Sequence, residues 1–484
     1  MSVDPLPWYD ADVRRLLTGR RLLLAGGVAA SWTPAVEQSR RWGAAEVAVL
    51  ATQGQGVGPP PDCRTIVVDM PPGLPVMEQI RWDQHQLLNL RDEARAALDA
   101  FDPDGTALVR GHFLITASEV AGRPVLAFRR PEWVALEDKL IADDVWRGAG
   151  IAYAASVVAD LDAAWARSPE VDRGDGVVWA GDATEGWHGG GALTEWVRTE
   201  AEAAEAVATL AGHCRTVRIM PFLEGVPCSI HGIVCEDGVA ALRPVELVTL
   251  RKGRRLVYCG CATYWDPPPA VREEMRGVAR RVGALLAAET GFRGAFTVDG
   301  VATAEGFRPT ELNPRAGAGL TTIARGVPDF PVFEILDLIV SGRGISCGAA
   351  ELEAQLVTAA DAARAGGTWR MDPDLAMDAP ERRLRFDGRD WHTTDPAGSI
   401  DTGVVPERDT VVAGGGAGGA QAATTQSPPA TPGGMAVAGP AFVRCTFTDW
   451  PVGPSVAPAA AAFYAWADRH LGTSIGPLTP PAQG

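Results

Sequence analysis

The sequence predicts a soluble α/β protein of two to four domains, and two observations support this prediction. The chain has 484 residues, of which 46% are apolar and 21% are charged, so it is too long for one ordinary core and has the composition of a globular protein. Near its start, a strand, a Gly-Gly turn, a helix and a second strand follow one another at the spacing of an open parallel α/β unit.

Charge and cysteine usage narrow the class of partner. The 44 basic and 60 acidic residues give a net charge of −16, which argues against nucleic acid or an anionic membrane surface as the main partner. Residues 1–12 are neither basic nor apolar, and the longest apolar run, residues 22–30, is far shorter than a membrane span. The eight cysteines contain no CxxC and only one close pair, Cys259 and Cys261, so we interpret them as structural thiols. We expect a cytoplasmic protein.

Residues 1–128 form the first predicted domain. Apolar runs predict strands at residues 21–25, 45–50, 65–68 and 124–128, and the intervening patterns predict helices up to Trp42 and over 77–101. The turn at Gly26-Gly27 suggests a dinucleotide site, but GxGxxG is absent. We therefore interpret this turn as one that only shapes the fold.

Residues 129–345 form the second predicted domain, with a smaller subdomain over about 150–222. A helix beginning near Pro131 is expected to carry Lys139, and another is expected over 159–166. A glycine-rich loop, residues 186–191, separates strands at 177–179 and 193–197. The remaining expected elements are helices at 200–210 and 271–289 and strands at 216–220, 230–234, 245–250 and 294–313.

The pattern weakens in the third region, residues 346–484. Residues 408–439 are Gly, Ala, Ser, Thr and Pro with almost no charge, so they cannot bury enough apolar area to offset the entropy of ordering, and we expect a flexible segment. A strand at 441–447 and a helix at 457–471 are expected to dock back onto the protein.

The strongest chemical signal is a pair of carboxylates with an amide and a guanidinium. Asp299 ends one predicted strand, and Glu311 and Asn313 share a face of the next, since residues i and i+2 of a strand point the same way. Pro314 ends that strand, and Arg315 follows it. Such oxygen ligands suit Mg²⁺ held between carboxylates and phosphates, and an arginine can grip phosphate. The alternative is a hairpin with solvated charges.

Together with other motifs, this constellation resembles the ATP-grasp family. The resembling pieces occur in the family's order across residues 20–345, and each is weak alone. They are residues 122–128 with Pro131-Glu-Trp and Glu137-Asp138-Lys139, the glycine-rich loop, Ile219–Gly225 as a hinge, Gly291–Asp299 as a metal strand, and Glu311-Leu-Asn-Pro-Arg315. The resemblance implies a Rossmann-like pre-ATP-grasp domain, an ATP-grasp domain of two α+β subdomains, and a C-terminal extension.

The resemblance also implies roles for particular residues. Lys139 would contact the nucleotide phosphates and the loop glycines would fold over them, whereas the alternatives are a surface lysine and a plain flexible loop. Residues 220–223 would sandwich the adenine with Leu312 opposite, although these apolar residues could equally be ordinary core. The implied positions are, for phosphates, Lys139, Gly186, Gly189, Gly190 and Gly191; for adenine, Met220, Leu223 and Leu312; and for metal, Asp299, Glu311 and Asn313.

Two positions depart from the family pattern. Members often carry a second lysine on the strand before the glycine loop, where this chain has Trp179, and an acidic residue for the ribose just after the hinge, where it has Cys228. These departures affect the expected contacts of the protein with the nucleotide phosphates and the ribose.

The implied reaction joins a carboxylate to an amine. The carboxylate attacks the γ-phosphate of ATP to give an acyl phosphate, and an amine then displaces phosphate; two Mg²⁺ ions bridged by Glu311, or Mn²⁺ in their place, would assist. Arg293 and Arg315 are the expected catalytic cations, and Arg251 and Lys252 are further candidates unless they form a solvated hairpin tip.

Three functions follow from this expectation. The first is an amino-acid or dipeptide ligase with small-molecule substrates, with γ-glutamyl transfer as one form. The second is a carboxylase that activates bicarbonate with a separate carrier, since neither lysine of the chain, Lys139 or Lys252, lies between methionines as a biotinyl lysine does. The third is a nucleotide sensor with a degenerate site, suggested by Trp179. A homodimer is usual in the resembling family.

Overall fold

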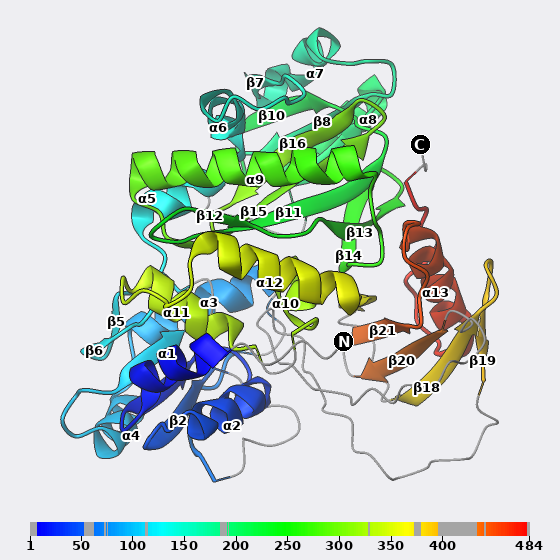
Figure 1. The fold of residues 1–484 in the computed structure, drawn as a ribbon. Coiled ribbons are helices and arrows are strands. Elements are labelled where there is room, and N and C mark those ends of the chain that lie inside the picture. The colour runs from blue at the N-terminus through cyan, green and yellow to red at the C-terminus, as the bar shows by residue number, and fades with distance from the viewer. Residues whose placement is uncertain are drawn as a thin grey trace.

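The computed structural model describes residues 7–52, 62–71, 74, 76–111, 115–183, 191, 193–327, 330–371, 379–394, 433–439 and 442–481. Within them lie a parallel four-stranded sheet, an antiparallel four-stranded sheet and a large sheet of eleven strands (Figure 1). The mixed α/β class predicted from the sequence is confirmed. No described helix has both the length and the apolar content that crossing a membrane requires.

The N-terminal sheet is parallel, with strand order β3-β2-β1-β4. Leu22, Leu23 and Leu24 of β1 are completely buried, as expected for a strand that is covered on both faces. The elements of this region are α1 (Pro7–Leu17), β1 (Arg21–Ala25), the 3-10 turn η1 (Ala29–Trp32), α2 (Thr33–Arg41), β2 (Glu46–Ala51), β3 (Arg64–Val67), α3 (Val76–Leu88), α4 (Asp92–Phe101), β4 (Leu108–Gly111), β5 (Glu119–Val120) and β6 (Arg123–Pro124).

Three strands predicted for this region are confirmed, and three details differ. The helical region expected over 77–101 is divided into α3 and α4. The strand expected at 124–128 is reduced to β6, which pairs only with β5, while β4 completes the sheet and was not predicted. Helix α1, which packs Leu16 and Leu17 into the core, was also missed.

A short connecting region leads to the second sheet. It contains α5 (Pro131–Val134), the 3-10 turns η2 (Ala135–Glu137) and η3 (Lys139–Ile141), and α6 (Ala142–Gly148). The helix expected to begin near Pro131 does so but ends after one turn, so Lys139 lies on a 3-10 turn instead of an α-helix. Asp138 caps this turn by accepting a hydrogen bond from the Leu140 amide at 3.0 Å.

The small antiparallel sheet, drawn at the top of Figure 1, has strand order β7-β10-β8-β9. Its elements are β7 (Val157–Asp160), η4 (Leu161–Ala163), α7 (Ala164–Arg167), η5 (Ser168–Glu170), β8 (Val177–Gly181), β9 (Thr194–Val197), α8 (Glu200–Leu210) and β10 (Thr216–Pro221). Helix α8 has the predicted bounds. The helix expected over 159–166 begins only at Ala164, because β7 extends to Asp160 and the 3-10 turn η4 occupies the next three residues.

A hinge joins β10 to the large sheet through residues 222–225. Gly225 has φ +143°, and a Cβ built there would lie 2.2 Å from the Ala302 carbonyl oxygen, so the crossing requires glycine. The large sheet then contains β11 (Val226–Val234), β12 (Val239–Ala241), β13 (Val245–Lys252), β14 (Arg255–Ala262), β15 (Gly294–Thr303) and β16 (Gly306–Asn313), with helices α9 (Pro269–Thr290), α10 (Ala318–Ala324), α11 (Val332–Val340) and α12 (Ala349–Ala362).

The two faces of the large sheet are covered differently. Helix α9 covers one face and packs Met275 and Val282 against Phe296 and Leu312 (Figure 1). Helices α10, α11 and α12 cover part of the other face, where Ile233 and Ala295 pack against them.

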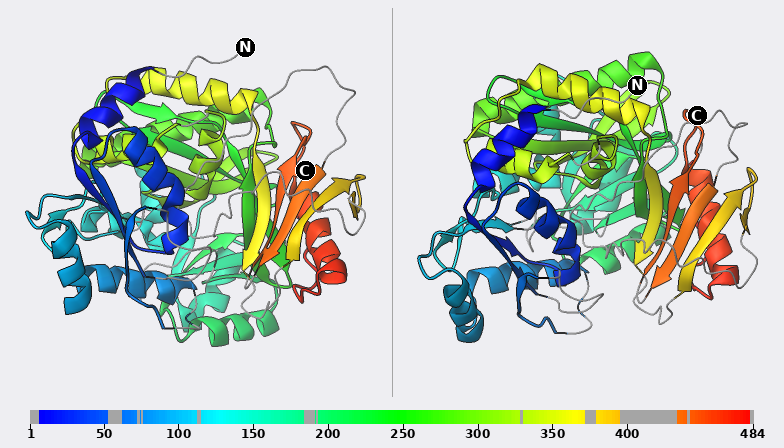
Figure 2. Two further views of the ribbon diagram at one scale, coloured as in Figure 1. Left: turned by 90° about the horizontal axis from the view of Figure 1, so that it is seen from below. Right: turned by 60° about the horizontal axis from the view of Figure 1, so that its bottom comes forward.

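The C-terminal region continues the large sheet. Strand β17 pairs with β14, so the sheet runs on through β21, β20, β18 and β19, with α13 packed against these strands (Figure 2). The elements are β17 (Gly366–Met371), β18 (Ala379–Phe386), β19 (Trp391–Thr393), β20 (Gly433–Gly439), β21 (Phe442–Thr448) and α13 (Ala457–His470). The segment predicted to be flexible, 408–439, was extended too far, because its last residues, 433–439, form β20. Residues 408–432 lie outside the described part.

Candidate active site

Two carboxylates face each other on neighbouring strands. Asp299 of β15 pairs directly with Glu311 of β16, and Thr297 pairs with Asn313, so all four side chains share one face of the large sheet. The Asn313 amide donates a hydrogen bond from Nδ2 to Asp299 Oδ2 at 2.9 Å. The hairpin therefore brings together the predicted metal ligands Asp299, Glu311 and Asn313.

Asp299 has a raised pKa in this cluster. Burial, and after it the neighbouring Glu311 carboxylate, raise the pKa of this carboxyl to about 7, although Arg315, Lys139 and the Asn313 hydrogen bond oppose the rise. A divalent cation between the two carboxylates would oppose both effects that raise the pKa. The electrostatics of the hairpin thus fit a metal ion.

The ligand chemistry of the cluster also fits Mg²⁺ better than a thiol- or imidazole-binding metal. Among the described residues, no group of three His, Cys, Asp or Glu side chains could hold a metal ion. The cluster instead offers two carboxylates and an amide, which matches the one or two protein carboxylates that accompany phosphate oxygens at magnesium sites. All eight cysteines are free thiols and seven of them are buried, in keeping with the structural role predicted for them.

Lys139 and Arg315 reach the carboxylates from two directions. Lys139 Nζ lies 4.0 Å from Glu311 Oε1. Arg315 donates from Nη2 to Asn313 Oδ1 at 2.8 Å and from Nε to Glu137 Oε1 at 2.8 Å. The oxygen of Asn313 that would bind metal is thus engaged by Arg315 in this structure.

Arg129 and Glu137 extend the cluster and were not predicted to belong to the site. Arg129 Nη2 lies 2.8 Å from Glu137 Oε1, the same oxygen that Arg315 contacts. Arg129 is only 5% exposed, and the Arg129 backbone amide donates to the Ile115 carbonyl. Glu137 lies in the Glu-Asp-Lys run and could have been suspected, whereas no sequence pattern pointed to Arg129.

A strip of buried polar groups continues from the carboxylates across the sheet. Ser229 and His231 of β11 pair with Asp299 and Thr297, and the hydroxyls of Ser229 and Thr297 and both ring nitrogens of His231 are buried without hydrogen-bond partners among the described residues. Burial lowers the pKa of His231 to about 3, so the ring is neutral. Gly317 lies over this strip, since a Cβ there would lie 2.6 Å from the Thr297 hydroxyl.

The small sheet places only part of the predicted nucleotide contacts. Met220 of β10 is buried beside Val178, Ala180 and Trp196, and Leu223 is in the hinge between the sheets. Gly191 is described, with φ +77°, next to the Leu256 carbonyl. The other loop positions, Gly186, Gly189 and Gly190, lie outside the described residues.

Trp179 does not stand where a second phosphate-binding lysine was expected. It faces α8 with its indole donating to Ser168 Oγ at 3.0 Å, whereas the face that carries Met220 presents Val178 and Ala180. Arg218, which pairs with Ala180 in the register, places a cation on that face. Its guanidinium already donates hydrogen bonds to three oxygen-bearing groups. These are the Asp143 carboxylate, the Ser156 hydroxyl and the Thr310 carbonyl.

Four further positions do not join the cluster. Leu312 points to the opposite face of β16 and is 3% exposed beneath α9, so its location does not suit an adenine contact. Cys228 is likewise buried in that core. Arg251 and Lys252 bind the C-terminal segment, where the Lys252 ammonium donates to the Ile475 carbonyl at 2.6 Å.

Arg293 also lies away from the carboxylates. It precedes β15 by one residue and donates to the Phe292 carbonyl. Asp299 follows it by six residues, which corresponds to about 20 Å along an extended strand. Arg293 is thus at the start of β15, which is the end that α11 approaches, since a Cβ on Gly294 would lie 2.6 Å from Val340. The structure therefore separates Arg293 from Arg315.

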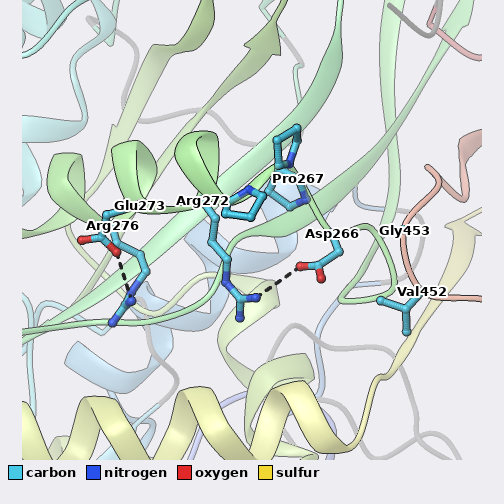
Figure 3. A pocket seen from close by; sticks show the side chains of 9 residues that line it. Asp266, Pro267, Arg272, Glu273, Arg276, Val452 and Gly453 are labelled. Carbon is cyan, nitrogen blue, oxygen red and sulfur yellow. Dashed lines mark hydrogen bonds and ion pairs between the residues drawn. The ribbon is translucent and has the colours of Figure 1, made fainter.

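A hollow of about 480 Å³ lies on the α9 side of the sheet. It is lined by residues of α9, the loop before it and the segment at Gly453 (Figure 3). The arginines in view are paired, Arg272 with Asp266 at 3.5 Å and Arg276 with Glu273 at 3.2 Å (Figure 3). Because Asp299 and Glu311 lie on the other face, this hollow is separate from the carboxylate cluster.

Comparison with known proteins identifies the fold. No protein-family model and no curated protein matches the sequence. Among solved structures, the biotin carboxylase domain of Hydrogenobacter thermophilus 2-oxoglutarate carboxylase, in complex with MgADP, ADP and bicarbonate, matches with a TM-score of 0.53 and 13% identity over 76% of this chain and 78% of that chain. Biotin carboxylase from Campylobacter jejuni, in complex with a β,γ-ATP ligand, matches with a TM-score of 0.52 and 13% identity over 76% and 79%. The chain has the ATP-grasp fold.

Proposed function

We propose that this protein is an ATP- and Mg²⁺-dependent ligase that activates a carboxylate through an acyl phosphate. The observation that supports this most is the convergence of Lys139, Asp299, Glu311, Asn313 and Arg315 on one face of the large sheet. These side chains come from separate segments, and a solvated hairpin would not gather Lys139 to it. One structural neighbour was solved with ADP and magnesium, and the fold match makes the same ligands reasonable here.

In the proposed site, the residues divide their work by charge. Asp299, Glu311 and Asn313 would hold magnesium, which when bound withdraws charge from the phosphate oxygens. Lys139 and Arg315 supply fixed positive charges beside the phosphoryl group, where they neutralise charge as the group transfers. The carboxylate oxygen of the substrate forms a bond to the γ-phosphorus while the bond to ADP breaks, and an amine then displaces phosphate from the acyl phosphate.

The carboxylate that is activated, together with its acceptor, distinguishes two functions. The first is an amino-acid or dipeptide ligase with small-molecule substrates. The second is a bicarbonate-activating carboxylase with a separate carrier, which the complex of a structural neighbour with bicarbonate favours. Neither lysine of this chain offers a carrier site, since Lys139 contacts Glu311 and Lys252 donates to Ile475. A homodimer, known for one neighbour domain, is part of the proposal.

The observation that suggested a degenerate nucleotide sensor has changed its meaning. That suggestion came from Trp179 in place of a lysine, but Trp179 belongs to the core beneath α8 and does not face the Met220 side. A complete set of carboxylates and cations on the large sheet supports catalysis instead.

A product assay tests the proposal. The purified chain is incubated with ATP and Mg²⁺, and with either pools of amino acids or bicarbonate, and ADP, phosphate and product masses are followed. Amino-acid-dependent ADP with a new dipeptide mass supports the first function, and bicarbonate-dependent ADP supports the second. Formation of AMP and pyrophosphate would contradict the acyl-phosphate mechanism.

A further inference from the structure

Arg129, Glu137 and Arg315 form a group in which one buried carboxylate serves a buried arginine, Arg129, and a partly exposed one, Arg315. Glu137 Oε1 lies 2.8 Å from Arg129 Nη2 and 2.8 Å from Arg315 Nε. The side chains of Glu137 and Arg129 are 5% and 6% exposed. Within this group of three, two guanidinium groups share the Glu137 carboxylate, and Arg129 and Glu137 are largely shielded from water.

Arg129 is incompletely satisfied in this arrangement. Its Nε, Nη1 and Nη2 are all buried without a hydrogen-bond partner in the described part of the chain, where the Glu137 carboxylate is the one within ion-pair distance of Arg129. Burial lowers the pKa of Arg129, and the Arg315 charge lowers it further while Glu137 raises it. Buried donors without partners are rare and costly in native proteins, so the group calls for a functional explanation.

The contacts of Arg315 suggest that explanation. In this structure Arg315 holds Glu137 and the Asn313 oxygen, both of which lie within the protein. To grip a phosphate or carboxylate of a ligand through the same Nε–Nη2 edge, the Arg315 guanidinium must release Glu137 and the Asn313 oxygen. Releasing Glu137 would leave a buried carboxylate alone unless another cation stays with it, and breaking a buried pair in that way is strongly unfavourable.

We propose that Arg129 is a positioning residue that retains Glu137 when Arg315 turns from Glu137 to the anionic ligand. Arg129 is suited to this because its Nε and Nη1 still have capacity to donate, and its backbone is tied to Ile115. Arg129 acts through Glu137 on Arg315 and does not itself touch the ligand. This inference rests on the proposed function, in which Arg315 contacts a ligand anion.

The test measures binding of a non-hydrolysable ATP analogue with Mg²⁺ by calorimetry. Arg129→Met should weaken binding by at least about tenfold, because Glu137 then has only Arg315 as counter-ion. Arg129→Lys should recover part of the affinity. The double variant Arg129→Met with Glu137→Gln should bind within about threefold of the unaltered chain, since the charge of Glu137 no longer holds Arg315. Arg130→Met, at an exposed neighbour that lies over Trp133, is the matched control and should not change affinity.

The outcomes separate the inference from the function on which it rests. If Arg129→Met does not fold by circular dichroism, Arg129→Gln takes its place in the same cycle. Unchanged affinity in the single variant overturns the inference, and so does equal loss in the single and double variants, because a packing role would not be rescued through Glu137. If the unaltered chain does not bind the analogue, the proposed function falls, and the inference falls with it.

Discussion

Two buried arginine clusters of this protein have opposite balances of charge. Arg110 of β4 contacts Glu334 and Asp337 of α11, each at 2.6 Å, so one arginine serves two carboxylates. At the candidate active site, two arginines share Glu137. The Arg110 cluster, Arg129 and Glu137 are nearly inaccessible to water, whereas the Arg315 side chain is 16% exposed; both clusters join segments far apart in the sequence.

The difference separates a structural cluster from a functional one. In the Arg110 cluster the contacts are short and the extra negative charge can be removed by a proton, because burial raises the pKa of Asp337 to about 6. That cluster fastens the N-terminal sheet to α11. The Arg129 cluster has an excess of positive charge that no proton transfer near neutral pH removes, since arginine remains charged. Excess positive charge next to Asp299 and Glu311 suits an anion that arrives with a metal ion.

The largest effect should come from the carboxylate opposite Asp299. Glu311→Ala removes a metal ligand and should reduce ATP-dependent product formation by about 10⁴-fold, because metal assistance accounts for several kcal/mol of the barrier. Turnover is measured as ADP release under saturating Mg²⁺. The control is Glu305→Ala, an exposed position in the turn of the same hairpin. Substantial activity in Glu311→Ala would show that the hairpin is not the metal site.

The structural cluster should respond in stability and not in binding. Arg110→Met leaves two buried carboxylates without their cation and should lower the free energy of unfolding by about 3–5 kcal/mol. Affinity for the Mg²⁺ complex of the ATP analogue should remain unchanged while the variant is folded. Urea unfolding measures the first quantity, with exposed Arg20→Met as control. If analogue affinity falls as much as in Arg129→Met, the two clusters do not differ as described.

Lys139 should contribute a smaller share of binding. Lys139→Met removes a cation near Glu311 and should weaken binding of the analogue by about 10–100-fold, the range of one charge-assisted hydrogen bond. The chain has one other lysine, which makes Lys252→Met a matched control. That variant should retain analogue affinity, because Lys252 binds the C-terminal segment. Equal losses in both variants would contradict the phosphate role of Lys139.

The smallest effect is a pH dependence in the Arg110 cluster. Burial, with a further contribution from Glu334, raises the pKa of Asp337 to about 6 from 3.8, although Arg110 opposes this. The folded protein therefore keeps a proton that the unfolded chain loses, so stability falls as pH rises from about 4 to about 6. Asp337→Asn should remove this slope, by at most about 1.4 kcal/mol per pH unit. Urea unfolding between these pH values measures the free energy of unfolding, with exposed Asp162→Asn as control. The effect is refuted if the free energy of unfolding depends on pH equally in Asp337→Asn and in the unaltered chain.

The sequence predicted well what depends on neighbouring residues. The alternation around Asp299 and the Glu311-Leu-Asn-Pro-Arg315 run are local patterns, and they form the expected hairpin with Glu311 opposite Asp299. The same alternation that puts Glu311 and Asn313 on one face puts Leu312 on the other, so strand geometry already opposed its assignment to adenine. Strand length similarly separates Arg293 from Asp299.

The remainder depends on contacts between distant segments. Arg129 and Glu137 lie beside Arg315 although more than 170 residues separate them in sequence, and no local periodicity predicts such a contact. The pairing of β17 with β14 was missed for the same reason, since β17 begins with Gly366, Gly367 and Thr368 and shows no strong alternation. The role of Trp179 depended on which face of β8 turns toward α8, and all five residues of that strand are buried.

The most direct test of the account is calorimetric binding of MgADP to the unaltered chain and to Glu311→Ala. The account predicts that the unaltered chain binds ADP in the presence of Mg²⁺ and much more weakly after Mg²⁺ is chelated, and that Glu311→Ala loses this dependence on Mg²⁺. Arg110→Met should bind like the unaltered chain. Absence of binding by the unaltered chain, or Mg²⁺-dependent binding that survives in Glu311→Ala, would contradict the assignment of this hairpin as the metal and nucleotide site.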